Sequence, residues 1–369
     1  MRGGGGVSGA NTATTTHRPK NLEQKTTAPC SGNSDDAAQA RSRAGESVAR
    51  TVAGRLGSGR AVPASDLFSL ATEAFGGTLA EGAFSPRDAY DAAELGLHLC
   101  LLRGAPLPES PSAFREALAE VEPLAELLPT QTRRTAEQND FQQFSTPAPY
   151  AALCAWVSGV GERDRVLEPS AGTGALCAFA LAAGASVHAN ELSGRRADLL
   201  SVLLREAGQD PERTLTRENA DHLDAVLPAS VRADIVLLNP PFSQTAGRLG
   251  RRRVPTVGTE HVLQALRRLD PGGRLVAILS AGVERSKTTH RAFFETIQSN
   301  PFCLRADVEV GGAVYRPNGT SVRTRLLVVD RTPASRAGER LSVETLAEAV
   351  DLLGSVRVRK DRRIGIPAL

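Results

Sequence analysis

The sequence predicts an α/β fold: a seven-stranded, mostly parallel sheet with helices on both faces and a terminal antiparallel hairpin. Within residues 140–331, five strand–helix units follow one another. Because helices alternate with strands along this part of the chain, the chain crosses back over the sheet and neighbouring strands run parallel. Two further strand patterns have no helix between them and are expected to pair as the hairpin. This arrangement is Rossmann-like, and a small helical region precedes it.

The chain of 369 residues is long enough for about two domains. Its first part is rich in Gly, Ser, Thr, Asn and Ala, and it cannot bury enough apolar surface to offset the entropy of ordering. After the polar connector TRRTAEQNDFQQ, helical patterns give way to alternating strands and helices. We expect a disordered tail at 1–45, a helical cap or interaction region at 46–130, an α/β domain at 140–331, and a C-terminal helix with a basic tail at 332–369.

Helices in the region 46–130 are indicated by apolar residues at helical spacing that end on glycine. The clearest one begins with Ser85 as N-cap and Pro86 at the first helical position, and it ends on Gly104. No catalytic cluster is evident here, so we expect this region to serve as a cap or an interaction module.

In the α/β domain, short aliphatic runs indicate strands, and longer runs with apolar residues at helical spacing indicate helices. Strands are expected at 164–170, 186–191, 213–220, 232–241, 274–280, 303–312 and 321–331. Helices are expected at 175–184, 194–208, 258–273 and 287–300, with one more at 342–354 in the tail.

The composition argues against several classes of protein. Hydrophobic residues make up 41% and charged residues 23%, as in an average globular protein. There is no apolar run long enough for a membrane-spanning helix and no apolar signal-peptide core, so we expect a cytoplasmic protein without a membrane partner. The five cysteines lack metal-ligand spacing, so no metal site is expected. The net charge of +3 is only weak evidence for a polyanionic partner.

The first strand–helix turn, Leu167–Leu176, reads LEPSAGTGAL and is a candidate ligand-binding segment. Gly172 and Gly174 would let the backbone approach a ligand closely, and the helix behind them offers free N–H groups. A dinucleotide site would require a third glycine where Cys177 stands. The Glu168 carboxylate would repel a pyrophosphate but suits an ammonium or sulfonium cation. The alternative, a turn without a ligand, explains two glycines but not the whole segment.

Acidic residues follow the second and third strands. Glu191 ends the second strand beside the first turn, where a carboxylate can accept both hydroxyls of a ribose. A solvated surface carboxylate is the alternative for this position. Asp221 follows the third strand and is placed to hold the exocyclic amine of an adenine, although a helix N-cap is an equally natural role for it.

The fourth strand ends on Asn239, Pro240, Pro241 and Phe242, which is unusual for a buried strand. The Asn side-chain oxygen and the proline carbonyls are acceptors, and proline has no N–H to donate. Two such acceptors could hold both hydrogens of an aromatic amine and free its lone pair for attack on an electrophilic methyl. Phe242 is expected to project past the sheet edge and to stack on a flat base. A Pro-Pro loop with a core Phe is the alternative, but it does not explain the position beside the ligand crevice of such sheets.

Two flanking segments are candidate contacts for charged groups. Upstream, Ser145 or Thr146 is expected to cap a helix with Pro147 in its first turn, and this helix either binds a carboxylate at its N-terminus or is an ordinary capped helix. Downstream, a flexible loop at 247–253 either grips phosphates or is merely solvated. The arginines of this loop are Arg248, Arg251, Arg252 and Arg253.

Together, EPSAGTG, NPPF and the upstream STP resemble the amino-methylating class I S-adenosylmethionine-dependent methyltransferases. Their order is similar to that of the gamma group of adenine-N6 DNA methyltransferases, over about residues 140–331. More narrowly, FQQFSTPAPYAALCAWV, NPPFSQTAGR and TEAFGGTLAEGAFSPRDAYDAAELG resemble the methyltransferase part of phage- and plasmid-borne strawberry-notch-like methyltransferase/helicase proteins. The resemblance implies a cofactor site of Thr146, Glu168, Pro169, Ala171, Gly172, Gly174, Glu191 and Asp221, with Asn239 to Phe242 as the catalytic segment.

The resemblance implies methyl transfer from S-adenosylmethionine to an exocyclic amine, with adenine N6 of DNA as the expected target. RNA and protein glutamine are alternative substrates, because guanine N2 and the glutamine amide are also planar amines. A non-catalytic cofactor-binding module of an antirestriction complex is the alternative from another class. The strawberry-notch-like proteins are associated with protecting mobile DNA from restriction. This chain shows no Walker A motif, so we expect the helicase half to be absent; the chain is then either a standalone form or a fragment, and a helicase-like protein is a candidate partner. No target-recognition domain is evident, so we expect low sequence specificity.

Overall fold

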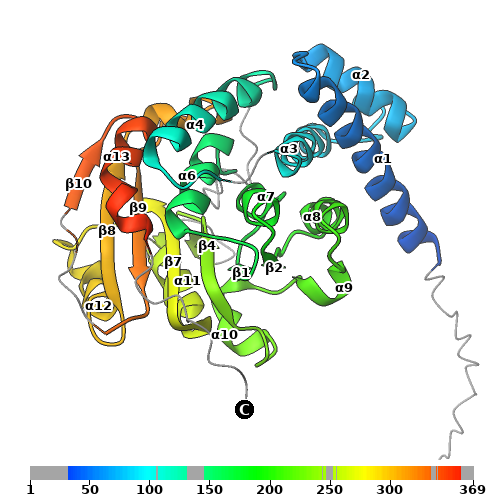
Figure 1. The fold of residues 1–369 in the computed structure, drawn as a ribbon. Helices are drawn as coiled ribbons and strands as arrows, with labels where there is room; N and C mark the ends of the chain where they lie inside the picture. The colour runs from blue at the N-terminus through cyan, green and yellow to red at the C-terminus, as the bar shows by residue number, and fades with distance from the viewer. Residues whose placement is uncertain are drawn as a thin grey trace, which may run out of the picture.

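The computed structural model describes residues 32–104, 107–130, 145–242, 244–246, 252–254, 256–333, 338 and 340–358. At the centre of this part of the chain lies an eight-stranded sheet in the order β10-β8-β9-β7-β4-β1-β2-β3 (Figure 1). The strands are β1 Arg165–Glu168, β2 Ser186–Asn190, β3 Leu215–Thr216, β4 Ala233–Leu238, β7 Leu269–Ser280, β8 Cys303–Val310, β9 Thr324–Asp330 and β10 Arg340–Val343.

The sheet is parallel except around β9, which runs antiparallel to both β7 and β8. The predicted fold class and the terminal hairpin, β8 with β9, are therefore confirmed. The predicted count of seven strands was wrong, because β10 adds an eighth strand in the segment assigned to the tail. β10 lies at the sheet edge and is largely exposed, so its sequence RLSV lacks the aliphatic run of a buried strand.

Side chains of the central strands alternate between two hydrophobic clusters on opposite faces of the sheet. On β4, Ile235 and Leu237 belong to the first cluster, whereas Val236 and Leu238 belong to the second. The first face is covered by α6 Ala148–Ser158, α7 Ala175–Ala182, α8 Gly194–Glu206 and α13 Leu346–Arg357. The second is covered by α10 Leu223–Val226, α11 Val257–Arg268 and α12 Thr288–Ile297.

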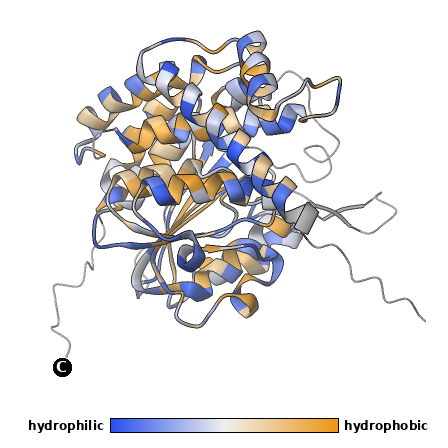
Figure 2. Ribbon diagram, turned by 90° about the vertical axis from the view of Figure 1, so that its right-hand side faces the viewer, coloured by the Kyte–Doolittle hydropathy of each residue, from blue (hydrophilic) through white to orange (hydrophobic). Residues whose placement is uncertain are grey.

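Figure 2 shows the apolar strands enclosed between helices whose outer surfaces are mixed or polar. The short helix α9, Pro211–Thr214, leads into β3 at the edge of the sheet. Among the helices that the structure describes, none has both the length and the apolar character needed to cross a membrane.

The helical region packs directly on the α/β part of the chain (Figure 1). Ser85 caps α3 as predicted: its hydroxyl accepts from the Asp88 N–H, and the Asp88 carboxylate accepts from the Ser85 N–H. α3 contacts α1, α7 and α8, so the region shares the first hydrophobic cluster with the sheet. Its helices are α1 Gly32–Gly57, α2 Ala64–Phe75, α3 Pro86–Leu102 and α4 Pro111–Glu126.

The start of the ordered helices differs from the prediction. α1 begins at Gly32, so residues 32–45 are helical rather than disordered. This stretch contains Ala, Arg and Gln, which are good helix formers, and the same helix continues into buried residues from Ala44 onward. The rest of the predicted tail, residues 1–31, lies outside the described residues.

Candidate functional site

Seven of the twelve predicted cofactor-binding and catalytic residues meet in one crevice at the carboxyl ends of β1, β2 and β4. The β1–α7 turn, the end of β2, the first turn of α8, the segment before α6 and the end of β4 all contribute to its wall. The predicted residues that line it are Thr146, Glu168, Ala171, Gly172, Glu191, Asn239 and Pro241. The other lining residues are Ser145, Ser170, Thr173, Ala175 and Arg196.

The two glycines of the β1–α7 turn have different roles. Both are left-handed, with φ of +58° at Gly172 and +98° at Gly174. A Cβ at Gly174 would lie 2.6 Å from Leu203 Cδ2 and 2.8 Å from Leu200 Cδ1, so this glycine allows the turn to pack on α8. A Cβ at Gly172 would meet no atom within 4 Å, and Gly172 lines the crevice. The absence of a side chain at Gly172 therefore leaves room for a ligand.

Glu191, just after β2, is held by two backbone donors. Its Oε2 accepts from the Gly172 N–H at 2.8 Å, and its Oε1 accepts from the Ser193 N–H at 2.8 Å. The side chain is only 9% exposed, so the alternative of a solvated surface carboxylate does not fit. A carboxylate has about four lone-pair sites, so each oxygen of Glu191 can accept a further hydrogen bond from a ligand.

Glu168, at the end of β1, is a buried carboxylate at the base of the crevice. It is 2% exposed, and Cys177 Sγ donates to its Oε2 at 2.7 Å. Burial raises its pKa to about 8, and the neighbouring Glu191 adds to this effect. A cation in the crevice would favour the ionised form, in agreement with the expected preference for an ammonium or sulfonium. Cys177, which stands where a dinucleotide turn would have glycine, acts here as a hydrogen-bond donor.

Asn239, at the end of β4, is held by a residue from the segment before α6. Its Nδ2 donates to Thr146 Oγ1 at 2.9 Å. The prediction that Ser145 or Thr146 caps this helix was wrong, because the N-cap is Pro147 and no side chain caps it. The reason is that both hydroxyls are engaged elsewhere: Thr146 pairs with Asn239, and Ser145 Oγ donates to Glu94 Oε2 at 2.9 Å.

Tyr315 supports Asn239 from a second direction and was not found by sequence reasoning. It lies in η2, Gly312–Asn318, between β8 and β9; it is fully buried, and its hydroxyl lies near enough to the Asn239 side chain to interact with it. Burial raises the pKa of this phenol, so it stays protonated and able to donate. The ring of Tyr150 packs against it edge-on, with centroids 6.1 Å apart. No local pattern links Tyr315 to Asn239, because only the folded sheet brings them together.

Pro240 and Phe242 lie outside the lining of the crevice. Phe242 is 7% exposed and belongs to the first hydrophobic cluster, so the prediction that its ring projects past the sheet edge was wrong. Transfer of an aromatic ring from water into an apolar core lowers the free energy, so the ring of Phe242 packs in the core. The ring of Pro240 and the carbonyl oxygen of Pro241 pack close to Gly258 at the start of α11.

Asp221 and Pro169 are likewise not part of the crevice lining. Asp221 lies in η1, Ala220–His222, and its Oδ1 is 2.8 Å from His261 Nε2. The alternative role as an N-cap is excluded, because Asn219 caps this turn by accepting from the Asp221 N–H at 3.0 Å. The adenine-binding role of Asp221 stays a prediction.

The segment after the Asn-Pro-Pro-Phe turn contains more regular structure than predicted. β5, Gln244–Ala246, and β6, Arg252–Val254, pair as an antiparallel ladder, so part of the expected flexible loop is a hairpin. Arg252 and Arg253 lie on β6, whereas Arg248 and Arg251 are outside the described residues. Phosphate contact by these arginines remains a prediction.

The helical region reaches the β1–α7 turn, which the sequence did not indicate. His98 of α3 lies with Nδ1 3.0 Å from the carbonyl oxygen of Thr173, so this nitrogen carries the proton and donates. Burial lowers the pKa of His98 to about 4, so the ring is neutral at physiological pH. The turn that lines the crevice is therefore supported from outside the α/β domain.

No protein-family model matches this chain, and no curated protein matches it. Solved structures similar to it include the methyltransferase subunit of a type I restriction-modification system from Streptococcus thermophilus, with 16% identity, a TM-score of 0.45, and coverage of 89% of this chain and 92% of that one. A protein from Listeria monocytogenes assigned to the class I S-adenosylmethionine-dependent methyltransferases has 13% identity, a TM-score of 0.46, and coverage of 88% and 98%. A protein from Vibrio vulnificus assigned as a type I restriction enzyme modification subunit has 18% identity and a TM-score of 0.46; the match covers 61% of this chain and about half, 53%, of that subunit.

Proposed function

We propose that the chain is an S-adenosylmethionine-dependent N-methyltransferase whose substrate is an exocyclic amine, adenine N6 of DNA. The observation that supports this most directly is that Asn239 lines the same crevice as the glycine turn and Glu168. An acceptor suited to an amine and a segment suited to a cationic nucleoside thus share one cavity.

The residues of the crevice fit the chemistry of S-adenosylmethionine. Gly172 leaves room beside the turn, and Glu168 is a buried carboxylate whose ionised form a sulfonium would favour. Glu191 keeps acceptor capacity for ribose hydroxyls, and we assign Asp221 to the adenine amine. When bound, this cofactor supplies an electrophilic methyl group.

Asn239 is the residue that we propose acts on the target amine. Its Nδ2 is engaged by Thr146, which fixes the plane of the amide. Its Oδ1, which has two lone pairs, and the Pro240 carbonyl oxygen would accept the two hydrogens of the amine. Held in this way, the amine lone pair would be free to attack the methyl group that bound S-adenosylmethionine would supply, with its thioether as the leaving group, and the surplus proton would pass to water.

An adenine in duplex DNA must leave the base stack to reach this crevice. The arginines of the hairpin after Phe242 would then hold the phosphates on either side of the extruded base. Phe242 itself is buried, and we propose that it supports the Asn-Pro-Pro turn from behind. The helicase-like partner and the antirestriction role remain proposals from the sequence. Copurification with the tagged chain from a phage- or plasmid-bearing host would test them.

Methyl transfer from isotopically labelled S-adenosylmethionine to duplex DNA, RNA of the same sequence and a glutamine-containing peptide tests the proposal, with mass spectrometry as the readout. We expect N6-methyladenine in DNA. Asn239→Ala should lower kcat by about a hundredfold or more while cofactor affinity stays the same. Methylation of the RNA or the peptide, with the DNA left unmodified, would show that the substrate is RNA or protein and not DNA. Cofactor binding without transfer to any of the three would favour the non-catalytic module.

Sequencing of methylated genomic DNA from an expressing host tests the expected low sequence specificity. Methylated adenines scattered over many sequence contexts would support it, whereas one dominant short motif would contradict it.

A further inference from the structure

The helical region places charged side chains next to the crevice wall. Along α3, Asp88, Asp91 and Glu94 are spaced three residues apart and so share one face of the helix. This face meets the first turn of α8, where Arg195 Nη1 lies 2.7 Å and Arg196 Nε 3.4 Å from Asp91 Oδ2. Opposite charges therefore join the helical region to the α/β domain beside the crevice.

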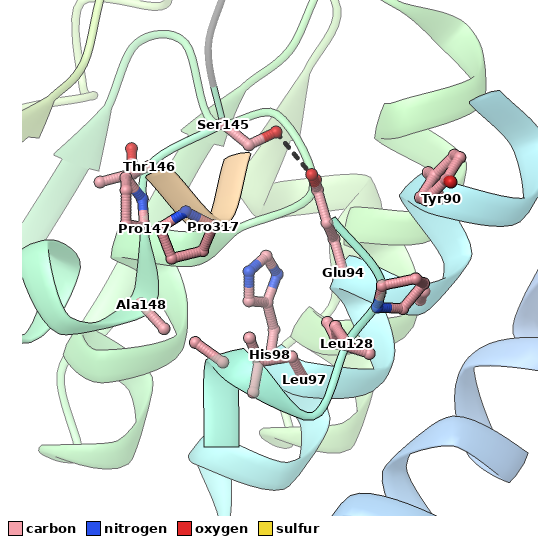
Figure 3. A pocket seen from close by; sticks show the side chains of 13 residues that line it. Tyr90, Glu94, Leu97, His98, Leu128, Ser145, Thr146, Pro147, Ala148 and Pro317 are labelled. Carbon is pink, nitrogen blue, oxygen red and sulfur yellow. Dashed lines mark hydrogen bonds between the residues drawn. The ribbon is translucent and has the colours of Figure 1, made fainter. Parts of the chain in front are cut away.

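Glu94 contacts two segments of the crevice wall at once. Its Oε2 accepts hydrogen bonds from Ser145 Oγ at 2.9 Å and Thr173 Oγ1 at 3.0 Å, and the Ser145 contact is visible in Figure 3. Ser145 and Thr173 both line the crevice. Glu94 itself lines a second small cavity that shares Ser145 and Thr146 with the first. The carboxylate of Glu94 therefore lies at the boundary between the two cavities.

Arg196 is the basic counterpart in the crevice wall. Its side chain is 17% exposed, and among the described residues that line the crevice it is the one basic residue. The carboxylates of Asp91, Glu94 and Glu191 raise its pKa, so it is fully charged and near all three. The crevice wall therefore has a guanidinium that can bind an anion, and close to it carboxylates that can bind a cation.

The N-terminus of α6 has few donors left for a carboxylate. Pro147 and Pro149 occupy the start of this helix, and neither has an N–H. The N–H groups of Tyr150 and Ala151 both donate to the Pro147 carbonyl oxygen, each at 2.9 Å. A carboxylate bound in this crevice would therefore find its strongest partner in Arg196, because a guanidinium forms charge-assisted, bidentate hydrogen bonds.

We propose that Glu94 and Arg196 together bind the zwitterionic amino-acid end of the cofactor, with Glu94 facing its ammonium and Arg196 its carboxylate. The proposal rests on the proposed function and assigns part of that same site to the helical region. A zwitterion presents two opposite charges a few ångströms apart, and an acid and a base in neighbouring parts of one wall complement it. The competing role for Glu94 is purely structural, as a link between Ser145 and Thr173.

The electrostatic surroundings of Glu94 agree with a cationic ligand. Its pKa is raised to about 7: desolvation is the largest cause, Asp91 acts in the same direction, and Arg196 and the two hydroxyls act in the opposite direction. An ammonium group beside this carboxylate would stabilise its ionised form and so gain affinity from it.

Calorimetric titration with two nucleosides that differ at the amino-acid end, neither of which carries a net charge, distinguishes a ligand-binding role of Glu94 from a purely structural one. S-Adenosylhomocysteine carries the zwitterion, and 5′-deoxy-5′-methylthioadenosine lacks it. We expect Glu94→Gln and Arg196→Gln each to weaken S-adenosylhomocysteine binding by about tenfold or more, and to change methylthioadenosine binding by less than about twofold. Glu73→Gln, on the exposed surface of α2, is the matched control and should change neither.

In the Glu94→Gln variant, the amide oxygen can still accept from Ser145 and Thr173, so a structural role predicts an unchanged affinity. Equal weakening of both nucleosides, or no weakening of either, would overturn the proposal and leave the proposed function standing. Failure of the unmodified chain to bind either nucleoside would overturn the proposed function and this inference together. Circular dichroism and thermal melting of each variant confirm that the protein compared is folded.

Discussion

Asn239 is positioned by side chains from two separate elements. Thr146 precedes α6 and accepts from the Asn239 Nδ2, while Tyr315 reaches the same amide from η2. These two neighbours therefore fix the orientation of the Asn239 amide and, with it, the direction of its oxygen. This arrangement suits a group that must present an acceptor to a substrate without reorganising.

Tyr315→Phe removes the hydroxyl and keeps the ring. We expect kcat to fall about tenfold with an unchanged Kd for S-adenosylmethionine, because the Asn239 amide loses a neighbouring polar group that helps to orient it. Tyr150→Phe is the matched control, since Tyr150 is also fully buried and its hydroxyl pairs with Thr324 at 3.1 Å. Steady-state kinetics and calorimetry measure both. The same kcat in the two variants would mean that Tyr315 has only a structural role.

Glu168 should make the stability of the ligand-free protein depend on pH. Its pKa rises from an ordinary 4.5 to about 8 through burial, with Cys177 and Glu191 as its titratable neighbours. The stability that comes from this shift is fully present below pH 4.5 and is lost as the pH rises through about 8. Between about pH 6 and pH 9, the thermal midpoint should fall by a few degrees through this group. A Glu168→Gln variant that falls just as steeply would contradict this account.

At the scale of the element, the β1–α7 turn combines a glycine that packs against α8 with a glycine that lines the crevice. Gly174 is pressed against the side chains of α8, while Gly172 faces the crevice. The same short segment thus closes the sheet–helix junction and forms the floor of the site.

Alanine at each of these positions should separate the two effects. Gly174→Ala is expected to lower the free energy of unfolding by about 2–3 kcal/mol, because its Cβ would collide with Leu203 and Leu200. Gly172→Ala is expected to cost about 1 kcal/mol for its positive φ and to weaken cofactor binding by about tenfold. Chemical denaturation and calorimetry report the two quantities. A similar stability loss at both positions with normal binding at Gly172→Ala would refute the distinction.

Elements with a strong local signal were predicted well from the sequence. The aliphatic run of β4 and the Ser85 cap of α3 needed only their own neighbours to be recognised. β10 was missed because an exposed edge strand carries no buried run, and it forms only where β8 offers a partner. Glu94, Arg196 and Tyr315 were missed for a related reason: their importance depends on contacts between segments that are distant in the sequence.

At the scale of the whole molecule, the helical region and the α/β domain share one hydrophobic cluster. α3 packs against α1 on one side and against α7 and α8 on the other, inside a single hydrophobic cluster. His98 and Glu94 extend that contact to Thr173 of the β1–α7 turn. A disturbance within the helical region should therefore be felt in the crevice.

Gly96→Leu tests this coupling at a distance from the crevice. A Cβ at Gly96 would lie 2.7 Å from Val52 Cγ1 and 2.8 Å from the Ala49 carbonyl oxygen, so a larger side chain must push α3 away from α1. We expect a loss of at least about 2 kcal/mol in unfolding free energy and weaker cofactor binding by the folded protein. Gly54→Leu, on the exposed side of α1 with no atom near its Cβ, is the control. Lower stability with unaltered cofactor affinity would show that the two parts act independently.

The two ends of the strand order are unusually short: β3 contains 2 residues and β10 contains 4. An open sheet leaves unpaired backbone groups along its outermost strands, and these can recruit strands from other molecules. Here that vulnerable rim amounts to a few peptide units on either side, while the long apolar strands β7 and β9 are flanked by neighbours within the same chain. We therefore expect little tendency for this sheet to recruit strands from other molecules into fibril-like aggregates.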